Sequence, residues 1–210
     1  MKKNLLVKFG QYKCDIFHKL NFSFKRGNSI LDVGCGDGVD AEIFIKVYGL
    51  KVYALDVFKH ENIRNIKSLK FTKGSIFKLP FEDKRFDYVF IHDVLHHIDE
   101  KTQSTSKHLK ALAELERVCK KGGTVIIIEA NRFNPLTYPH MVLMMGHNHF
   151  RQSYFVYLLN KAFVRCRFKY FEAHFYPQSF LGLFKVYEKF MELQPFKGIL
   201  NYNTAFIEAR

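Results

Sequence analysis

Short apolar runs alternate with amphipathic segments along the first two thirds of the chain. Five runs are typical of strands, at residues 29–33, 51–57, 69–74, 86–92 and 123–130. Helical spacing of apolar residues separates them near 38–48, 59–68 and 101–120. Strands that alternate with helices build a mostly parallel sheet with helices on both faces. We therefore predict an α/β fold of the doubly wound, Rossmann-like kind.

The last third of the chain continues this pattern less regularly. It predicts a helix at 152–164 and strands at 166–176 and 202–210, which brings the sheet to seven strands. A second helix carries an apolar stripe that we expect to pack on the sheet: Phe180, Leu183, Phe184, Tyr187, Phe190 and Met191. Between the two parts, residues 131–151 contain two prolines, three of the five methionines and three histidines, and we interpret them as a small insertion between sheet elements.

A glycine-rich turn follows the first predicted strand. In ILDVGCGDGVDAEIF the strand reaches Asp32, and Gly34, Gly36 and Gly38 alternate before a helical pattern begins near Val39. Such a turn lets the backbone approach a ligand closely, and the helix start offers free amides. The GxGxG spacing differs from the GxGxxG of dinucleotide sites, and no Gly-Lys-Ser/Thr follows as in a Walker loop.

Four motifs, taken in order, resemble those of the class I S-adenosylmethionine-dependent methyltransferases in their small-molecule branch. They are the Asp32 turn, Asp56 at the end of the second strand, GSIFKLPFEDKRFDYVFIHDVLHHI at 74–98 and ELERVCKKGGTVIIIEANR at 114–132. The resemblance covers residues 29–130. It implies the fold given above, methyl transfer as the activity and S-adenosylmethionine as the cofactor.

The resemblance also implies which residues hold the methionine part of the cofactor. Gly34, Gly36 and Gly38 would cradle it, and Asp32 would orient its ammonium group. Cys35 lies inside the same turn, where the family commonly has a small residue. We therefore expect Cys35 to contact the cofactor and not to act as a nucleophile.

On the nucleoside side, the resemblance implies that Asp56 binds the ribose hydroxyls and Val57 flanks the adenine. Ser75 and Ile76 would meet the adenine edge, although Ser75 replaces an aspartate that is usual in the family. A hydroxyl accepts a hydrogen bond more weakly than a carboxylate does. His92, at the end of the fourth strand, would line the methionine pocket.

The resemblance also implies that the chain is one methyltransferase domain with four segments. The segments are an N-terminal helical segment (1–28), a cofactor-binding half (29–130), a substrate-side insertion (131–151) and a half that completes the sheet (152–210).

Histidines are the candidates for catalysis, because an acceptor that must lose a proton needs a base. One group follows the fourth strand and another lies in the insertion: His92, His96 and His97, then His140, His147 and His149. Ligands of parallel sheets bind at the carboxyl ends of the strands, so both groups can face one pocket. The candidates are His92, His96, His97, His147 and His149. No carboxylate stands near His147 and His149 in the sequence, so we predict no metal site.

The acceptor is suggested by the aromatic residues more than by the net charge of +13. Aromatic and methionine side chains concentrate after residue 130, where the acceptor would bind, and soft apolar surfaces suit irregular hydrophobic ligands. We expect a hydrophobic or amphiphilic small-molecule or lipid-like acceptor, with peripheral membrane contact an option. The sequence implies no obligate protein partner.

Two alternatives stay open. An RNA methyltransferase would use the positive charge for backbone contacts. Against a nucleic-acid substrate, the end of the fourth strand reads Ile91, His92, Asp93, Val94, unlike the Asn/Asp-Pro-Pro-Tyr site of base-amine methyltransferases. The other alternative is a catalytically silent cofactor-binding protein, although Asp56 and the glycines are present. Scattered cysteines and the lack of a long apolar run lead us to expect a cytoplasmic protein.

Overall fold

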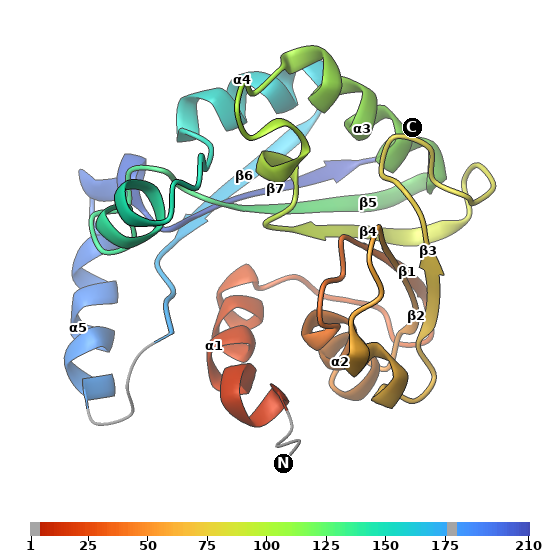
Figure 1. Ribbon diagram of the computed structural model, residues 1–210, viewed down its shortest axis with the longest axis horizontal. Coiled ribbons are helices and arrows are strands. Elements are labelled where there is room, and N and C mark those ends of the chain that lie inside the picture. The colour runs from red at the N-terminus through yellow and green to blue at the C-terminus, as the bar shows by residue number, and fades with distance from the viewer. Residues whose placement is uncertain (1–4, 176–179) are drawn as a thin grey trace.

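The structure is a computed structural model that describes residues 5–175 and 180–210. A seven-stranded sheet of order β3-β2-β1-β4-β5-β7-β6 forms its centre (Figure 1). The strands are β1 (Ser29–Val33), β2 (Lys51–Asp56), β3 (Lys70–Lys73), β4 (Phe86–His92), β5 (Cys119–Ala130), β6 (Cys166–Phe171) and β7 (Tyr202–Glu208). In the described sheet, β7 pairs antiparallel with both β5 and β6, and the other neighbouring strands pair in parallel. The predicted mostly parallel, Rossmann-like sheet is confirmed.

Helices cover both faces of the sheet (Figure 1). On one face lie α1 (Leu5–Leu20) and α2 (Val39–Lys46), which bury aromatic side chains against β4 and β5. On the other lie α3 (Thr105–Val118) and α4 (Gln152–Ala162). The stripe that predicted α3 faces the sheet as expected, with Leu112, Leu115 and Val118 fully buried.

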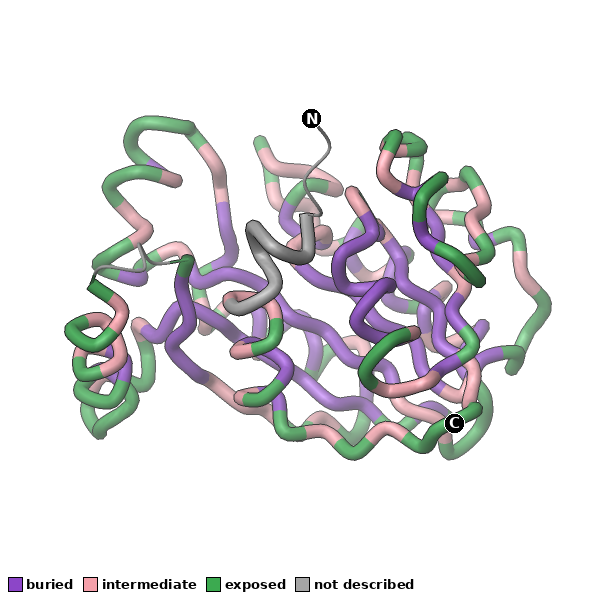
Figure 2. The backbone as a smooth tube through the Cα atoms, turned by 90° about the horizontal axis from the view of Figure 1, so that it is seen from below, coloured by how far each residue is buried: buried purple, intermediate pink, exposed green. Residues whose placement is uncertain are grey.

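The central strands carry the core of the molecule. Val89, Phe90 and Ile91 of β4 and the run Val125 to Ile128 of β5 are fully buried, so both faces of these strands are covered (Figure 2). This burial fixes where each parallel strand ends, and therefore where the loops after β1, β2 and β4 meet. In the described part of the chain, no helix is long and apolar enough to cross a membrane.

Some short helices of the structure are 3-10 or π-helices and not α-helices. The helix predicted at 59–68 is a 3-10 helix, η1 (Glu61–Asn65), whose start is capped by the side chain of His60 accepting from the backbone N–H of Asn62. Two further 3-10 helices are η2 (Leu95–Asp99) and η5 (Phe196–Ile199). The insertion contains a π-helix, η3 (Tyr138–Met144). The strand predicted at 166–176 ends at Phe171, and residue 176 lies outside the described residues.

The expected packing of α5 (Leu181–Met191) is found only in part, because Met191 is buried and Phe184 and Tyr187 are half-buried, but the other three residues of the stripe are exposed. Phe180, Leu183 and Phe190 are 57%, 68% and 54% exposed, whereas Glu188 is only 2% exposed. Glu188 Oε2 lies 2.7 Å from Lys19 Nζ of α1 and 2.9 Å from Lys185 Nζ. A paired carboxylate can be buried, so α5 buries Glu188 as well as Met191 while half of its apolar stripe stays exposed.

Candidate active site

The turn after β1 needs its glycines for different reasons. All three have a positive φ, at +74° for Gly34, +51° for Gly36 and +83° for Gly38. A Cβ on Gly34 would lie 2.4 Å from Cγ2 of Val94, and one on Gly38 would lie 2.5 Å from Cδ1 of Ile66. A Cβ on Gly36 would meet nothing within 4 Å. Gly34 and Gly38 therefore allow close packing, whereas Gly36 borders open space that a ligand can fill.

That open space is a cavity of about 420 Å³ at the carboxyl ends of β1, β2 and β4. Asp56 connects the turn after β1 to the loop after β2. Its Oδ2 accepts from the backbone N–H of Gly36 at 2.9 Å, and its Oδ1 accepts from that of Phe58 at 3.0 Å. The residues expected to bind the cofactor that line this cavity are Gly34, Cys35, Gly36, Asp56, Val57, Ile76 and His92.

Three residues expected at the cofactor do not line the cavity. Gly38 forms the start of α2, behind the turn. Asp32 is 2% exposed, and burial together with the neighbouring Asp40 raises its pKa well above the ordinary value. Ser75 is exposed and its hydroxyl accepts from the backbone N–H of Phe77 at 3.3 Å. Its neighbours Gly74 and Ile76 line the cavity instead.

A buried cluster of charges at the cavity was not foreseen from the sequence. Oδ2 of Asp40 lies 3.0 Å from Lys13 Nζ and 2.8 Å from His92 Nδ1. Burial opposes ionisation of Asp40, but Lys13 and His92 outweigh it and hold the pKa of this carboxyl well below its ordinary value. Nε2 of His92 is buried without a hydrogen-bond partner. A helix at the start of the chain thus contributes a lysine to the cavity wall.

The cavity is rich in carboxylates, which suits a positively charged ligand. Those that line it are Asp37, Asp40, Asp56 and Asp93, with Lys13 as the cation. A sulfonium and an ammonium group are both stabilised by such a wall. The open cradle at Gly36 and the Asp56 carboxylate therefore fit a cofactor of the S-adenosylmethionine kind.

A second cavity, of about 470 Å³, adjoins the first. As predicted, both groups of histidines face it: His96, His97, His140, His147 and His149. His92 is the exception and lines the first cavity. The rings of His147 and His149 stack with centroids 5.9 Å apart, so their side chains lie side by side. Tyr12 of α1 and Tyr202 of β7 complete the wall.

Among the described residues, Asp93 and His97 line both cavities. Asp93 has a φ of +54°, a conformation that is uncommon outside glycine and that often marks functional sites. Its Oδ1 accepts from the backbone N–H of Ala130 at 2.8 Å. Burial opposes its ionisation, yet His92 and His96 lower its pKa. Burial and the charge of His96 lower the pKa of His97.

Glu129 organises the segment that carries these residues. It is fully buried, and its Oε1 accepts from the backbone N–H groups of Val94 at 3.0 Å and Leu95 at 2.6 Å. Its Oε2 lies 2.7 Å from Nδ1 of His96. Burial opposes a charged imidazole at His96, but Glu129 raises its pKa. His96 is therefore held by Glu129, whereas His97 is half-exposed.

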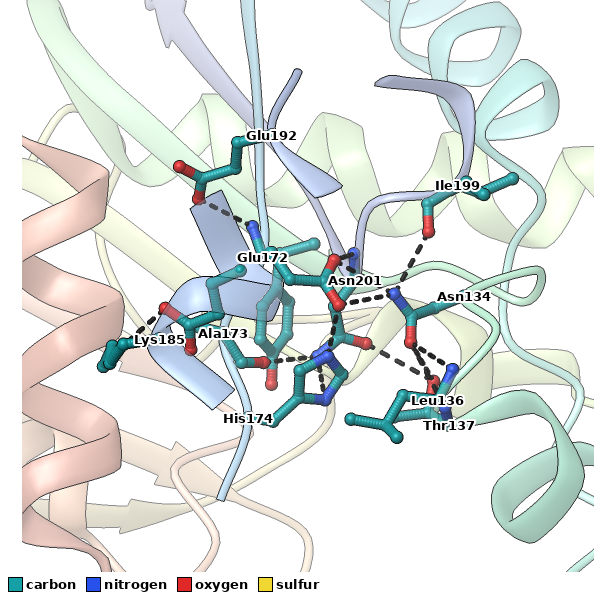
Figure 3. Close-up of polar contacts among 12 residues, drawn as sticks. Asn134, Leu136, Thr137, Glu172, Ala173, His174, Lys185, Glu192, Ile199 and Asn201 are labelled. Carbon is teal, nitrogen blue, oxygen red and sulfur yellow. Dashed lines mark hydrogen bonds and ion pairs between the residues drawn. The ribbon is translucent and has the colours of Figure 1, made fainter. Parts of the chain in front are cut away.

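A hydrogen-bonded network forms another wall of the second cavity (Figure 3). Glu172 is fully buried and accepts from Nδ2 of Asn134 at 2.9 Å and from the backbone N–H of Asn201 at 2.8 Å. The imidazole of His174 joins it through Nε2. His174 and Asn201 line the cavity, so this network fixes the orientation of polar groups that an acceptor would meet.

The expectation that no carboxylate accompanies the insertion histidines is wrong. Oε1 of Glu100 lies 3.1 Å from Nδ1 of His147, and Oε2 lies 3.6 Å from Nδ1 of His97. Glu100 is far from His147 in sequence, so spacing alone gave no signal. Ligand-type atoms of Asp93, His96 and Glu129 also lie within 4.8 Å of one another. Glu129, however, already accepts from Val94, Leu95 and His96.

The four cysteines are free thiols, and Cys35 and Cys119 are buried. Burial raises the pKa of the Cys35 thiol well above its ordinary value, and Asp32 raises it further. Such a thiol is protonated and inert at neutral pH. This agrees with the expectation that Cys35 is not a nucleophile.

A family model gives the first comparison with known proteins. Residues 31–127, slightly less than half of the chain, match the model described as a methyltransferase domain. This segment of the chain is therefore similar to methyltransferase domains. Gly36 and Asp56, which line the first cavity, both lie within this segment.

Two curated relatives match part of the chain. An uncharacterized methyltransferase of Schizosaccharomyces pombe is 37% identical over 130 residues, which are 55% of this chain and 44% of the relative. A demethylmenaquinone methyltransferase of Staphylococcus aureus is 29% identical over 140 residues, which are 61% of this chain and 54% of the relative. The chain thus matches about half the length of these curated relatives.

Solved structures share the fold. A chain of the Haloferax volcanii complex between the Trm112 methyltransferase activator and a methyltransferase has a TM-score of 0.69 at 14% identity, over 97% of this chain and 93% of that one. A Haemonchus contortus phosphoethanolamine N-methyltransferase in complex with S-adenosyl-L-methionine has a TM-score of 0.62 at 17% identity, over 96% and 53%. At these identities the likeness concerns the fold alone.

Proposed function

We propose that the protein is a methyltransferase that transfers the methyl group of S-adenosylmethionine to a hydrophobic or amphiphilic small-molecule or lipid-like acceptor. One observation carries this proposal. The cofactor cavity and the histidine-lined cavity share Asp93 and His97, so a methyl donor in one cavity would face an acceptor in the other. Methyl transfer needs this in-line approach more than it needs any one catalytic group.

The cofactor, when bound, supplies the methyl group on an electrophilic sulfonium. The residues that would hold it are Gly34 and Gly36 at the methionine part, Asp56 at the ribose, and Val57 and Ile76 at the adenine. Asp40 is kept charged by Lys13 and His92 and would place a negative charge beside the ammonium group. The carboxylate of Asp93 would stand near the sulfonium, where a negative charge favours binding of the cation.

The second cavity supports an apolar acceptor with a polar end. Leu136, Met141 and Phe175 supply apolar surface, and histidines gather on the side toward Asp93 and His97. Ligand sites commonly combine such apolar walls with a few placed polar groups. The relation to a demethylmenaquinone methyltransferase agrees with a small-molecule acceptor.

The first experiment is cofactor binding by isothermal calorimetry on the whole chain. We expect S-adenosylmethionine to bind one site, and Asp56→Ala to weaken the affinity by about 10-fold or more, since a hydrogen bond to a charged group is worth about 1.5 to 3 kcal/mol. Glu82→Ala is the matched control, because Glu82 is exposed and lies outside both cavities. Equal binding by Asp56→Ala and Glu82→Ala would refute the site.

The second experiment identifies the acceptor class. The protein is incubated with methyl-labelled cofactor and cell extract, and the label is followed into lipid, aqueous metabolites and RNA. We expect label in the lipid or organic-soluble fraction, and none with Asp56→Ala. Label in RNA that disappears at high salt would instead favour an RNA methyltransferase.

A further inference from the structure

A cluster of ligand-type side chains joins two segments that are distant in sequence. His97 lies on η2, Glu100 directly follows it, and His147 lies beyond the π-helix of the insertion. Ligand atoms of the three residues all lie within 4.8 Å of one another. Glu100 is the centre of the group, with one carboxylate oxygen toward each imidazole.

The spacing of these atoms matches the coordination shell of a small divalent cation. Zinc binds imidazole nitrogen and carboxylate oxygen at about 2.0 to 2.2 Å with tetrahedral geometry, which separates neighbouring ligand atoms by about 3.3 to 3.6 Å. Glu100 Oε1 lies 3.1 Å from His147 Nδ1, and Glu100 Oε2 lies 3.6 Å from His97 Nδ1. Since the ligand atoms of the three residues lie within 4.8 Å of one another, binding of an ion would draw these side chains closer together.

The carboxylate is already held in place by its neighbours. The backbone N–H of Asn148 donates to Oε1 of Glu100 at 3.1 Å, and Nδ2 of Asn148 donates to the carbonyl of Glu100 at 2.7 Å. Contacts of this kind orient the ligands of metal sites. The other cluster, at Glu129, differs because its carboxylate accepts two backbone amides and holds His96 in a fully buried position.

The position of the cluster gives an ion access from two sides. All three residues line an outer cavity of about 680 Å³, and His97 and His147 also line the acceptor cavity. Three protein ligands with one open position are typical of catalytic zinc sites. Two imidazoles among the donors favour zinc and similar transition ions over magnesium, which prefers oxygen ligands.

We infer that His97, Glu100 and His147 bind one zinc-type divalent cation, whose open coordination position takes an oxygen atom of the acceptor. The second half of this inference rests on the proposed function. An acceptor hydroxyl bound there releases its proton to solvent because the ion lowers its pKa. The oxygen then forms the bond to the methyl carbon, and the sulfonium keeps the electron pair of the broken C–S bond, which leaves S-adenosylhomocysteine.

The test begins with metal binding alone, which needs no acceptor. The whole chain is freed of metal with a chelator and titrated with ZnCl₂ in the calorimeter. We expect one Zn²⁺ per chain, with affinity weakened more than about 10-fold in His147→Ala and in Glu100→Gln. His140→Ala is the matched control for Zn²⁺ affinity, because His140 lines the same acceptor cavity outside the cluster. Absent zinc binding, or equal binding in all four proteins, would overturn the inference.

Folding of the variants is checked by their S-adenosylmethionine affinity, since neither Glu100 nor His147 lines the cofactor cavity. If a variant fails this check, the wild type still decides. Co²⁺ should give the visible absorption of a tetrahedral nitrogen and oxygen site, and excess Mg²⁺ should not displace it. An octahedral spectrum, or displacement by Mg²⁺, would overturn the zinc-type site.

The same measurements separate this inference from the proposed function. Cofactor binding without zinc binding refutes the metal site alone, and zinc binding without cofactor binding refutes the methyltransferase proposal alone. For the role of the open position, chelation should lower methyl transfer to the extract acceptor by the wild type but not by His147→Ala. If chelation leaves methyl transfer by the wild type unchanged, the open position of the ion does not bind the acceptor oxygen.

Discussion

The cofactor cavity and the acceptor cavity adjoin each other but are built in different ways. Short loops that directly follow β1, β2 and β4 supply most of the first cavity. The second combines residues from α1, η2, the insertion, and the segments around β6 and β7. The first is a local product of the parallel sheet, and the second depends on long-range contacts. A substitution in the wall of the acceptor cavity should therefore disturb the packing of several segments at once.

The largest effect should come from Glu129, which joins β5 to η2. Glu129→Ala leaves two backbone N–H groups and the imidazole of His96 without their carboxylate. Removing one partner from a buried charged pair costs about 3 to 5 kcal/mol. We expect a loss of this size in the free energy of unfolding, measured by urea denaturation. Glu208→Ala, at the exposed end of β7, should change stability by less than about 0.5 kcal/mol. Equal midpoints for the two variants would show that Glu129 does not organise this wall.

The comparison explains what could be predicted from the sequence. Local patterns in the sequence predict the Gly34 turn and the strand ends at Asp56 and His92. They also predict that the two groups of histidines come together. Parallel strands end at one edge of the sheet, so residues that follow different strands come together whatever the details of packing. The same rule brought His97 and His147 to one cavity, as predicted.

Residues whose partners are set by packing could not be predicted. Lys13 reaches Asp40 because α1 rests on α2, and no periodicity links these positions. Glu188 pairs with Lys19 across α5 and α1, whereas Leu183 of the expected core stripe faces solvent. Ser75 was placed by resemblance, but its side chain bonds within its own loop. Each of these outcomes depends on a pair of side chains distant in sequence or on one local hydroxyl.

On the cofactor side, Gly34→Ala should have the next largest effect. The added Cβ meets Val94 at 2.4 Å and must adopt a φ of +74°. Overpacking costs about 1 to 3 kcal/mol and the left-handed conformation about 1 more. We expect S-adenosylmethionine affinity, measured by calorimetry, to fall by about 30-fold or more.

Gly122→Ala is the control for this substitution, since Gly122 has the same φ of +74° with nothing within 4 Å of the added atom. It should leave cofactor affinity unchanged. Adding Val94→Ala to Gly34→Ala should restore part of the affinity by removing the clash. If the double variant binds no better than the single one, backbone strain and not packing limits the turn.

Lys13→Met tests whether α1 belongs to the cofactor side. Losing a hydrogen bond between charged groups should cost about 1.5 to 3 kcal/mol of stability near pH 7. The folded-state pKa of Asp40 lies below its ordinary value of 3.8, so its contribution is present above that pH and is lost as pH falls through the folded value. The difference between variant and wild type, from denaturation at several pH values, should thus shrink below pH 3.8. Lys46→Met, which removes the solvent-exposed partner of Glu42, should cost under about 1 kcal/mol. A pH-independent loss would contradict the assigned partner.

The smallest effect should come from the apolar stripe of α5. Leu183 is 68% exposed, so Leu183→Ser removes little buried surface and should change the free energy of unfolding by less than about 0.5 kcal/mol. Leu115→Ser, in the buried stripe of α3, should cost at least about 2 kcal/mol, because it leaves a cavity and buries a hydroxyl. Thermal denaturation of the two variants measures the contrast. Equal losses would mean that α5 is covered in solution.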